Sequence, residues 1–325
     1  MSANLAGKDG SAKAGPSLFM AADSGRGDRV FRRVATAVAA LLPLMSLGML
    51  FILGSAAWLC LRGMGLGFLT SQVWDPVKEV FGAAAFVYGT LASSLIALLV
   101  AGPLGVAIAL AITEFAPMKL RGTAALVVEL LAAVPSVIYG LWGMFVFAPF
   151  MRVHVEPLLL RFVGGPLFRP GGTGLSLLTA GLVVAIMILP TVMAICREVF
   201  DSVPVALRES ALSLGATRWE STAMAVLRPS KAGIIGALIL GMGRALGETM
   251  AVTMVIGNRG LISANLLGPS DSLASVIANQ FTEATSEMHL SALAALGFLL
   301  FFITMALNLA ARFLVWSTSR RFRRA

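Results

Sequence analysis

Residues Val34–Leu61 read VATAVAALLPLMSLGMLFILGSAAWLCL, a run of 28 residues without an acidic or basic side chain. A helix rises about 1.5 Å per residue and the hydrocarbon core of a bilayer is about 30 Å thick, so this run is long enough to cross a membrane. It is also longer than the apolar part of a cleavable signal peptide. Because backbone N–H and C=O groups need internal partners in lipid, we expect the run to form a spanning helix.

Five more apolar runs of similar length follow along the chain. They are Ala84–Ile112, Gly122–Phe147, Gly174–Cys196, Ala232–Gly257 and Ser291–Trp316. The chain is 58% hydrophobic and 13% charged, with a mean hydropathy of +0.89, which excludes a soluble globular protein. The sequence therefore predicts an all-α, polytopic membrane protein with six transmembrane helices. Pro103, Pro135 and Pro190 lie inside the second, third and fourth runs and predict kinks there.

The basic residues lie mostly between these runs and mostly on one side. Of the 25 Lys and Arg residues, 18 fall on the side that carries both chain ends, six on the opposite side, and Arg244 lies within the fifth run. Because basic residues accumulate in cytoplasmic loops, we predict a multi-pass protein of the cytoplasmic (inner) membrane with both termini in the cytoplasm. The net charge of +9 is then an orientation signal and requires no nucleic-acid partner.

The two ends of the chain carry no apolar run. Residues 1–33 are rich in Gly, Ala, Ser and basic residues without helical periodicity, which predicts a disordered cytoplasmic N-terminal tail. Residues 317–325 are predicted to form a basic cytoplasmic C-terminal tail. The six-helix transmembrane domain then covers residues 34–316.

The sequence lacks the residues of common enzyme and metal sites. It contains two cysteines and two histidines, too few for a disulfide framework or most metal centres. Cys60 and Cys196 fall at opposite ends of the predicted spans, so a bilayer would separate them. No nucleotide-hydrolysing, zinc-protease or serine-hydrolase motif is visible. We therefore predict a non-enzymatic chain with no catalytic residue, no metal and no bound cofactor, whose energy comes from elsewhere.

Two charged residues, Arg244 and Glu248, lie within the fifth run. At 1.5 Å per residue, Arg244 is about 18 Å from the cytoplasmic end of the run, and Glu248 follows four residues later on the same helical face. A charge near the bilayer midplane costs about 2.5–3.5 kcal/mol, so both side chains should face a partner or a wet cavity. Two interpretations stay open. The pair either holds the helix against its neighbours or forms part of a path for an oxyanion, which a guanidinium binds with two hydrogen bonds.

Glu248 indicates which oxyanion would pass. Phosphate near neutral pH still carries a proton that a carboxylate can accept, whereas sulfate carries none and would be repelled. Gly243 and Gly247 are four residues apart, a spacing at which another helix can pack closely. Glu129, in the third run, is a further intramembrane charge, for which we consider a path or gate role and, alternatively, hydrogen bonding between helices.

Residues 197–231, between the fourth and fifth runs, form the longest internal cytoplasmic connection. Apolar residues at helical spacing predict a helix that begins near Pro204 and stops at Gly215, and a second amphipathic segment follows at Trp219–Leu227. Two short helices joined at a glycine are typical of a docking surface for a cytoplasmic protein. The alternative is a pair of interfacial helices that rest on lipid head groups.

The same segment resembles the EAA motif of ABC importer permeases. The matching positions are Glu209, Ser210 and Ala211 for the Glu-Ala-Ala triplet, then Gly215 and Leu227. Two positions differ, since Ser210 replaces the middle alanine and Arg228 separates Leu227 from the proline that follows. The fifth run and the stretch Glu129–Gly140 resemble the PstC-type permease subunits of phosphate ABC transporters. This resemblance covers about Val34–Trp316.

The resemblance implies a type I ABC importer permease fold and ATP-driven import of inorganic phosphate. It implies coupling to an ATPase through residues 201–227, a substrate path at Arg244 and Glu248, and coupling residues at Glu209, Ser210, Ala211, Gly215 and Leu227. The implied partners are a PstA-type sister permease, a PstB-type ATPase dimer that binds ATP and Mg²⁺, and a PstS-type phosphate-binding protein outside. A permease for sulfate, molybdate or phosphonate and an ion-coupled secondary anion transporter remain the alternatives.

Overall fold

The computed structural model describes residues 27–170 and 172–322. The chain divides into two units, which meet between Phe51 and Ile52. The first described helix, α1, covers Gly27–Met64, so its first 25 residues belong to the first unit and the remainder to the second. Within the described residues the secondary structure is helical apart from one short antiparallel hairpin, β1 with β2.

The second unit contains all the other elements. From the N-terminal side these are α2 (Gly67–Thr70), β1 (Trp74–Asp75), β2 (Val80–Phe81), α3 (Ala84–Leu110) with the π-helical turn η1 (Ala111–Phe115), α4 (Met118–Ala132), α5 (Ser136–Trp142), η2 (Gly143–Phe147), α6 (Ala148–Phe150), η3 (Met151–Val155) and α7 (Glu156–Phe162). They continue with α8 (Leu177–Asp201), α9 (Val205–Ser213), α10 (Arg218–Ser221), η4 (Thr222–Leu227), α11 (Lys231–Leu246), α12 (Met250–Val255), α13 (Leu273–Gln280) and α14 (Glu287–Phe322).

Five helical segments are long and apolar enough to cross a membrane. They are Gly27–Met64, Ala84–Phe115, Ser136–Phe162, Leu177–Asp201 and Glu287–Phe313. A sixth span is counted if Arg218–Leu227 and Lys231–Leu246, which meet at a bend of 71°, are taken together. The prediction of an all-α polytopic membrane protein is confirmed, but two of the six predicted spans are not continuous helices.

The predicted third span, 122–147, is broken at Pro135. α4 ends at Ala132 and α5 begins at Ser136, because proline has no N–H to donate and holds the residue before it in an extended conformation. The helix that starts after Pro135 then continues through π-helical turns to Phe162. The candidate span is therefore Ser136–Phe162, and residues 148–162, which lie between the predicted third and fourth spans, are helical. Pro103 and Pro190, in contrast, lie inside continuous helices.

The predicted fifth span, 232–257, is also interrupted. α11 ends at Leu246, residues 247–249 form no helix, and α12 begins at Met250. α11 contains 16 residues and is therefore about 24 Å long, which is shorter than the hydrocarbon core. The break consequently lies within the apolar run rather than at its end.

Both ends of the described chain are more helical than predicted. α1 already begins at Gly27, with Asp28 in its first turn, where a carboxylate interacts favourably with the helix dipole. Residues 27–33 of the predicted disordered tail are therefore helical, and residues 1–26 lie outside the described part. α14 runs to Phe322, so residues 317–322 of the predicted C-terminal tail are helical as well, and 323–325 lie outside the described part.

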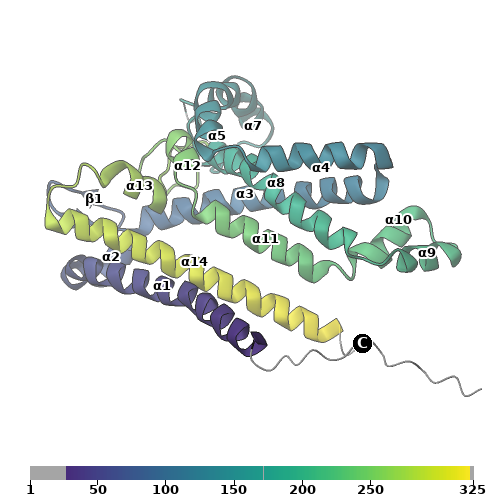
Figure 1. Ribbon diagram of the computed structural model, residues 1–325. Helices are drawn as coiled ribbons and strands as arrows, with labels where there is room; N and C mark the ends of the chain where they lie inside the picture. The colour runs from purple at the N-terminus through teal and green to yellow at the C-terminus, as the bar shows by residue number, and fades with distance from the viewer. Residues whose placement is uncertain (1–26, 171, 323–325) are drawn as a thin grey trace, which may run out of the picture. The chain divides into compact units, whose positions relative to one another are not determined.

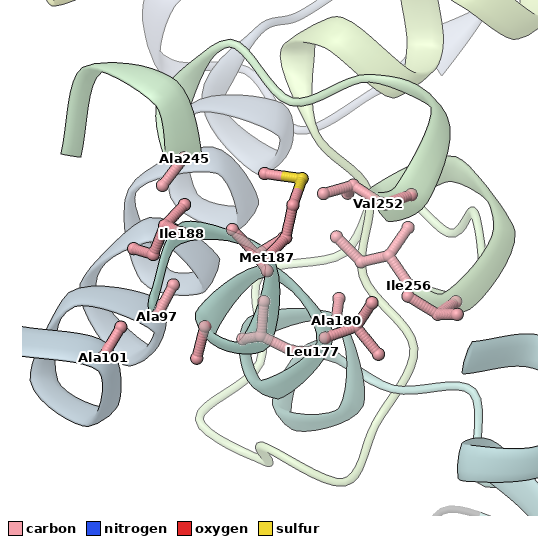
Figure 2. Packing of buried hydrophobic residues seen from close by; sticks show 14 residues of the cluster. Ala97, Ala101, Leu177, Ala180, Met187, Ile188, Ala245, Val252 and Ile256 are labelled. Atoms are coloured by element: carbon pink, nitrogen blue, oxygen red, sulfur yellow. The ribbon is translucent and has the colours of Figure 1, made fainter. Parts of the chain in front are cut away.

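Figure 1 shows α3, α8 and α11 side by side, with α9 and α10 beyond one end of this group and β1 and α13 at the other. Buried side chains of α3, α8, α11 and α12 gather around Met187 and Ile188 of α8 (Figure 2). Met187 points toward Val252 of α12, and Ile188 lies beside Ala245 of α11 (Figure 2). α8 therefore provides the common support for α11 and α12 on the two sides of the break.

Glycines allow α8 to approach its neighbours closely, at Gly241 of α11 and at Gly181 of α8 itself. A Cβ atom added at Gly241 of α11 would lie 2.7 Å from Val192 Cγ2 of α8, and one at Gly181 of α8 would lie 2.6 Å from Ile96 of α3. At Gly243 an added Cβ meets nothing within 4 Å, and at Gly247 it meets only the carbonyl oxygen of Gly243, at 3.7 Å. Gly243 and Gly247 therefore make no close helix contact among the described residues, because Gly243 faces away from α8 and Gly247 has already left the helix.

Candidate functional site

The break between α11 and α12 positions the two charged residues of the fifth apolar run. Arg244 lies in the last turn of α11, where the negative end of the helix dipole favours a cation. Glu248 lies in the break itself, and its Oε1 accepts a hydrogen bond of 3.2 Å from the backbone N–H of Ala251, in the first turn of α12. The prediction that both side chains share one helical face is wrong, because the helix ends at Leu246.

Arg244 and Glu248 do not form an ion pair. Ion pairs of the described residues include Lys78–Asp75, Arg197–Glu129, Arg197–Asp201 and Arg208–Glu114. In the part of the chain that the structure describes, the guanidinium of Arg244 has one side-chain partner, the hydroxyl of Thr191 on α8, at 3.1 Å from Nη1. Since both Arg244 and Glu248 are only half-buried, the remaining N–H groups of one and the second carboxylate oxygen of the other can reach a ligand.

Two polar residues at the breaks and beside Arg244 were not predicted as site residues from the sequence. Thr191 follows Pro190 in α8, and a hydroxyl next to an intrahelical proline is the signal that could have identified it. Tyr139 of α5 donates its hydroxyl to the carbonyl of Leu131 at 2.9 Å, across the break at Pro135.

Glu129 contacts a different residue. It lies on α4 with its side chain 65% exposed, and its Oε1 is 3.8 Å from Nη2 of Arg197 on α8. Arg197 in turn lies 4.0 Å from Asp201, one turn further along α8. Within the described residues the structure thus pairs Glu129 with Arg197 rather than with Arg244 or Glu248. This arrangement favours the alternative of an interhelical contact over a path or gate role.

The segment 197–231 has the helix–glycine–helix form that we predicted. α8 extends to Asp201, α9 follows, and Gly215 adopts φ +87°, the left-handed conformation that ends a helix and that glycine adopts without strain. Thr217 and Glu220 then form a reciprocal capping box at the start of α10. The chain continues as η4 up to Leu227, so both helices and the glycine joint are confirmed.

A hollow of about 650 Å³ lies between the two helices of this segment, and we call it the coupling groove. Its lining includes Leu207, Ser210, Ala211, Leu214, Gly215 and Met224. Three of the five predicted coupling residues therefore line the groove, while Glu209 is exposed outside it and Leu227 packs against the buried cluster of α3, α8 and α11. Leu214 and Trp219 are 89% and 59% exposed, which is typical of a surface that another protein covers.

An ion pair that we did not predict joins α9 to the end of α3. Nη2 and Nε of Arg208 donate to Oε1 of Glu114, in η1, at 2.8 and 3.1 Å. Arg208 also donates to the carbonyls of Val203 and Phe200, at 2.7 and 2.8 Å. Arg218 donates to the carbonyl of Glu114 at 2.7 Å. The coupling groove is therefore attached to both α3 and α8 by charge-assisted hydrogen bonds.

The described residues contain no group of three or more His, Cys, Asp and Glu side chains that could hold a metal ion. Cys60 and Cys196 are both buried free thiols. His289 is buried against the ring of Phe81, at 5.3 Å between centroids, and its Nε2 lies 3.1 Å from Oε1 of Gln280. These contacts are those of residues that stabilise the fold.

Long apolar helices, one of them broken at a half-buried arginine, are features expected of a membrane transport permease. Residues 101–324 match the family model of the binding-protein-dependent transport system inner membrane component, and the chain belongs to this family. It is a multi-pass membrane protein and a transport subunit that works with an ATPase and further transporter components.

Similar curated proteins carry the name phosphate transport system permease protein PstC. The one from Mesorhizobium japonicum is 44% identical over 299 residues, which is 90% of this chain and 91% of the relative. The one from Xylella fastidiosa is 43% identical over 303 residues, or 91% and 93% of the two chains. A third, from Pasteurella multocida, is 44% identical over 270 residues, or 82% and 84% of the two chains.

Solved structures show the same fold at low sequence identity. An inward-facing conformation of the MetNI methionine ABC transporter matches 75% of this chain and 99% of its own with a TM-score of 0.57 at 16% identity. A second crystal form of the same transporter matches 71% and 93% with a TM-score of 0.53 at 17% identity. The chain therefore has the type I ABC importer permease fold that the sequence resemblance implied.

Proposed function

We propose that this chain is the permease subunit of an ATP-driven importer that carries inorganic phosphate across the cytoplasmic membrane. The observation that carries the proposal is the guanidinium of Arg244, which lies half-buried at a break in an apolar run and, among the described residues, has Thr191 as its one side-chain hydrogen-bond partner. The PstC relatives, which share up to 44% identity over most of the chain, support phosphate as the substrate.

The chemistry of the break suits an anion that still carries a proton. The unpaired N–H groups of Arg244 can bind two oxygens of a tetrahedral oxyanion in parallel. Glu248 keeps one carboxylate oxygen available, which can accept the proton of a phosphate ion. Sulfate carries no proton near neutral pH, so the same carboxylate would repel it.

Energy enters through the coupling groove. In the proposed complex the exposed apolar residues around the groove contact a PstB-type ATPase dimer, which binds ATP and Mg²⁺ and performs the hydrolysis. A PstA-type sister permease completes the membrane domain, and a PstS-type protein delivers phosphate from outside. Closure of the ATPase dimer would move α9 and α10, and ATP can drive the cycle because it binds the two states of the complex with different free energies.

The proposed orientation places both termini and the coupling groove in the cytoplasm. It is supported by the excess of basic residues on the side that carries the chain ends and residues 197–231. Reactivity of single cysteines with a membrane-impermeant maleimide in intact cells tests it. Labelling at residue 214 only after permeabilisation is expected, and labelling in intact cells contradicts it.

Phosphate uptake by cells that carry Arg244→Gln tests the proposed path. We expect uptake to fall at least tenfold while the complex still assembles, and the matched control Arg62→Gln, an exposed arginine at the end of α1, should leave uptake unchanged. Normal uptake by the Arg244 variant would reject the path. Uptake that persists without the ATPase would instead identify a secondary transporter.

The choice among oxyanions has its own test. If phosphate is the substrate, Glu248→Gln should reduce phosphate uptake, and an excess of sulfate, molybdate or a phosphonate should not compete with phosphate. Competition by one of these anions, with unchanged phosphate uptake in the variant, would favour a permease for that anion.

A further inference from the structure

The hydroxyl of Thr191 differs from most helix-borne hydroxyls of this chain. The usual arrangement is a hydrogen bond to the carbonyl one turn earlier, as for Thr90, Ser94, Thr113 and Thr304. Thr191 Oγ1 instead accepts a hydrogen bond of 3.1 Å from Nη1 of Arg244. Within the described residues its own proton has no acceptor, although the side chain is half-buried in an apolar span.

We infer that Thr191 contacts the transported anion directly, side by side with Arg244. A hydroxyl can accept and donate at the same time, so the bond from Arg244 leaves the proton of Thr191 available for an anion oxygen. The hydroxyl thus adds a neutral donor beside the charged donor that the guanidinium supplies. This inference rests on the proposed function, because it assigns a second residue to the same path.

The bond to Thr191 also orients the guanidinium. With Nη1 directed at Oγ1, the neighbouring nitrogen Nη2 has no hydrogen-bond partner among the described residues. An anion oxygen beside Nη2, at the end of the guanidinium, can accept from an N–H of Nη2 and from the hydroxyl of Thr191. The anion would therefore receive one hydrogen bond from Arg244 and a second from Thr191.

The helix that carries Thr191 is firmly held. Its neighbour Val192 is fully buried, with its side chain against Gly241 of α11 and Gly105 of α3. Thr191 and Arg244 therefore lie on two helices whose separation is set by a glycine contact one turn from Arg244. Close packing of the supporting residues is what keeps donors in position for a ligand.

The chemistry identifies the class of ligand. The donors of Arg244 and Thr191 and one acceptor, the second carboxylate oxygen of Glu248, suit a tetrahedral oxyanion that carries both unprotonated oxygens and an O–H group. Monohydrogen and dihydrogen phosphate have this pattern, as does arsenate, whereas sulfate lacks the O–H group. Thr191 is therefore inferred to contribute to the recognition of the anion as well as to its passage.

The experiment compares Thr191→Val, which removes the hydroxyl at nearly constant volume, with Thr191→Ser, which keeps it. The whole complex, with its ATPase, sister permease and binding protein, is reconstituted in vesicles, and phosphate transported per ATP hydrolysed is measured. We expect the ratio to fall about tenfold for Thr191→Val and to stay within about twofold of the parent for Thr191→Ser. ATP hydrolysis should remain within about twofold in both, since the coupling groove is unchanged.

The matched control is Thr253→Val in α12. Thr253 is also half-buried close to the break, but its hydroxyl donates to its own helix, at 2.7 Å from the carbonyl of Thr249. This variant should transport as much phosphate per ATP hydrolysed as the parent complex. If Thr191→Val does not assemble, Thr191→Cys replaces it, because a thiol is nearly isosteric with the serine hydroxyl and a much weaker donor.

Three results would overturn the inference. If Thr191→Val transports as much phosphate per ATP hydrolysed as the parent complex, the hydroxyl does not bind the anion. The same holds if this ratio falls as far in Thr191→Ser as in Thr191→Val. A parallel loss of transport and ATP hydrolysis in Thr191→Val would show that the bond to Arg244 only holds α8 against α11. Failure of the parent complex to transport phosphate would reject the proposed function itself, which keeps the two failures distinguishable.

Discussion

Arg208 and Glu114 form the most enclosed ion pair among the described residues, with side chains 20% and 12% exposed and Nη2 2.8 Å from Oε1. The two residues lie 94 positions apart in the sequence, on α9 and at the end of α3. Because Arg208 also binds two carbonyls near the end of α8, a displacement of α9 acts on α3 and α8 together. The pair is therefore well placed to carry movement of the coupling groove into the membrane helices.

Glu114→Gln should weaken this connection. The amide keeps the shape of the side chain but removes the charge, which leaves Arg208 with neutral acceptors, and a loss of about 1–3 kcal/mol is expected. Thermal unfolding of the purified complex measures the loss, and the ratio of transport to ATP hydrolysis should fall as well. The control is Glu209→Gln in the stability measurement, since Glu209 is exposed. Equal unfolding temperatures for the two variants would contradict the role of the pair.

Gly215→Ala should distort the joint of the coupling groove. Nothing lies within 4 Å of an added Cβ, so the cost is conformational and comes from φ +87°, about 1 kcal/mol. We expect weaker binding of the ATPase, measured by co-purification at increasing salt and detergent. Gly236→Ala in α11 is the matched control, because its Cβ also meets no atom and its backbone is helical. If both variants retain the ATPase equally, the left-handed joint is unimportant.

Gly241→Ala should destabilise the chain, and Gly243→Ala should not. The new methyl group at 241 would lie 2.7 Å from Val192 Cγ2, and forcing α8 and α11 apart should cost about 1–3 kcal/mol. At 243 the methyl group has open space within this chain. The measurement is the thermal unfolding temperature of the purified complex. A larger loss at 243 than at 241 would instead indicate that Gly243 packs against the sister permease.

Asp271 should make stability depend on pH. It is 5% exposed in the segment between α12 and α13, and burial raises its pKa to about 6, against hydrogen bonds from Ser275 and Ser272 that lower it. Because the folded-state pKa exceeds the usual 3.8, Asp271 does not destabilise the folded state below pH 4, where its carboxyl is protonated. The free energy of unfolding then falls as the pH rises from 4 to 6. Asp271→Asn should therefore raise the unfolding temperature at pH 8 and leave it unchanged at pH 4, with a gain of up to about 3 kcal/mol.

Asp75 is the control for Asp271, because its pKa is shifted in the opposite direction. Hydrogen bonds from the backbone N–H groups of Lys78 and Val77 lower the pKa of this carboxyl, whose side chain is 30% exposed, against an opposing effect of burial. Its contribution to stability is present above pH 4 and is lost as pH falls further, so Asp75→Asn should not stabilise the protein at pH 8. A gain at pH 8 in both variants, or in neither, would contradict the assignment for Asp271.

Much of the architecture follows from local sequence. The apolar length of a run and the absence of internal charges are sufficient to predict membrane helices, because lipid admits few other backbone structures. The helix–glycine–helix form of residues 197–231 was also predictable, since Pro204 and Gly215 act on their own backbone. The sequence alone also shows that Arg244 and Glu248 lie within one apolar run and that burying their charges is unfavourable.

Tertiary structure decided the rest. α11 ends at Leu246 although no proline lies there to break the helix. The prediction of one continuous helix, with Arg244 and Glu248 on one face, was therefore wrong. Arg244 binds Thr191, 53 residues away, and Arg208 binds Glu114, 94 residues away, and neither pair has a periodic signal in the sequence. Local patterns determine which residues enter the membrane, because hydrophobicity acts residue by residue. Which polar groups meet inside it depends on helix packing, since a hydrogen bond requires two atoms within about 3 Å whatever their distance along the chain.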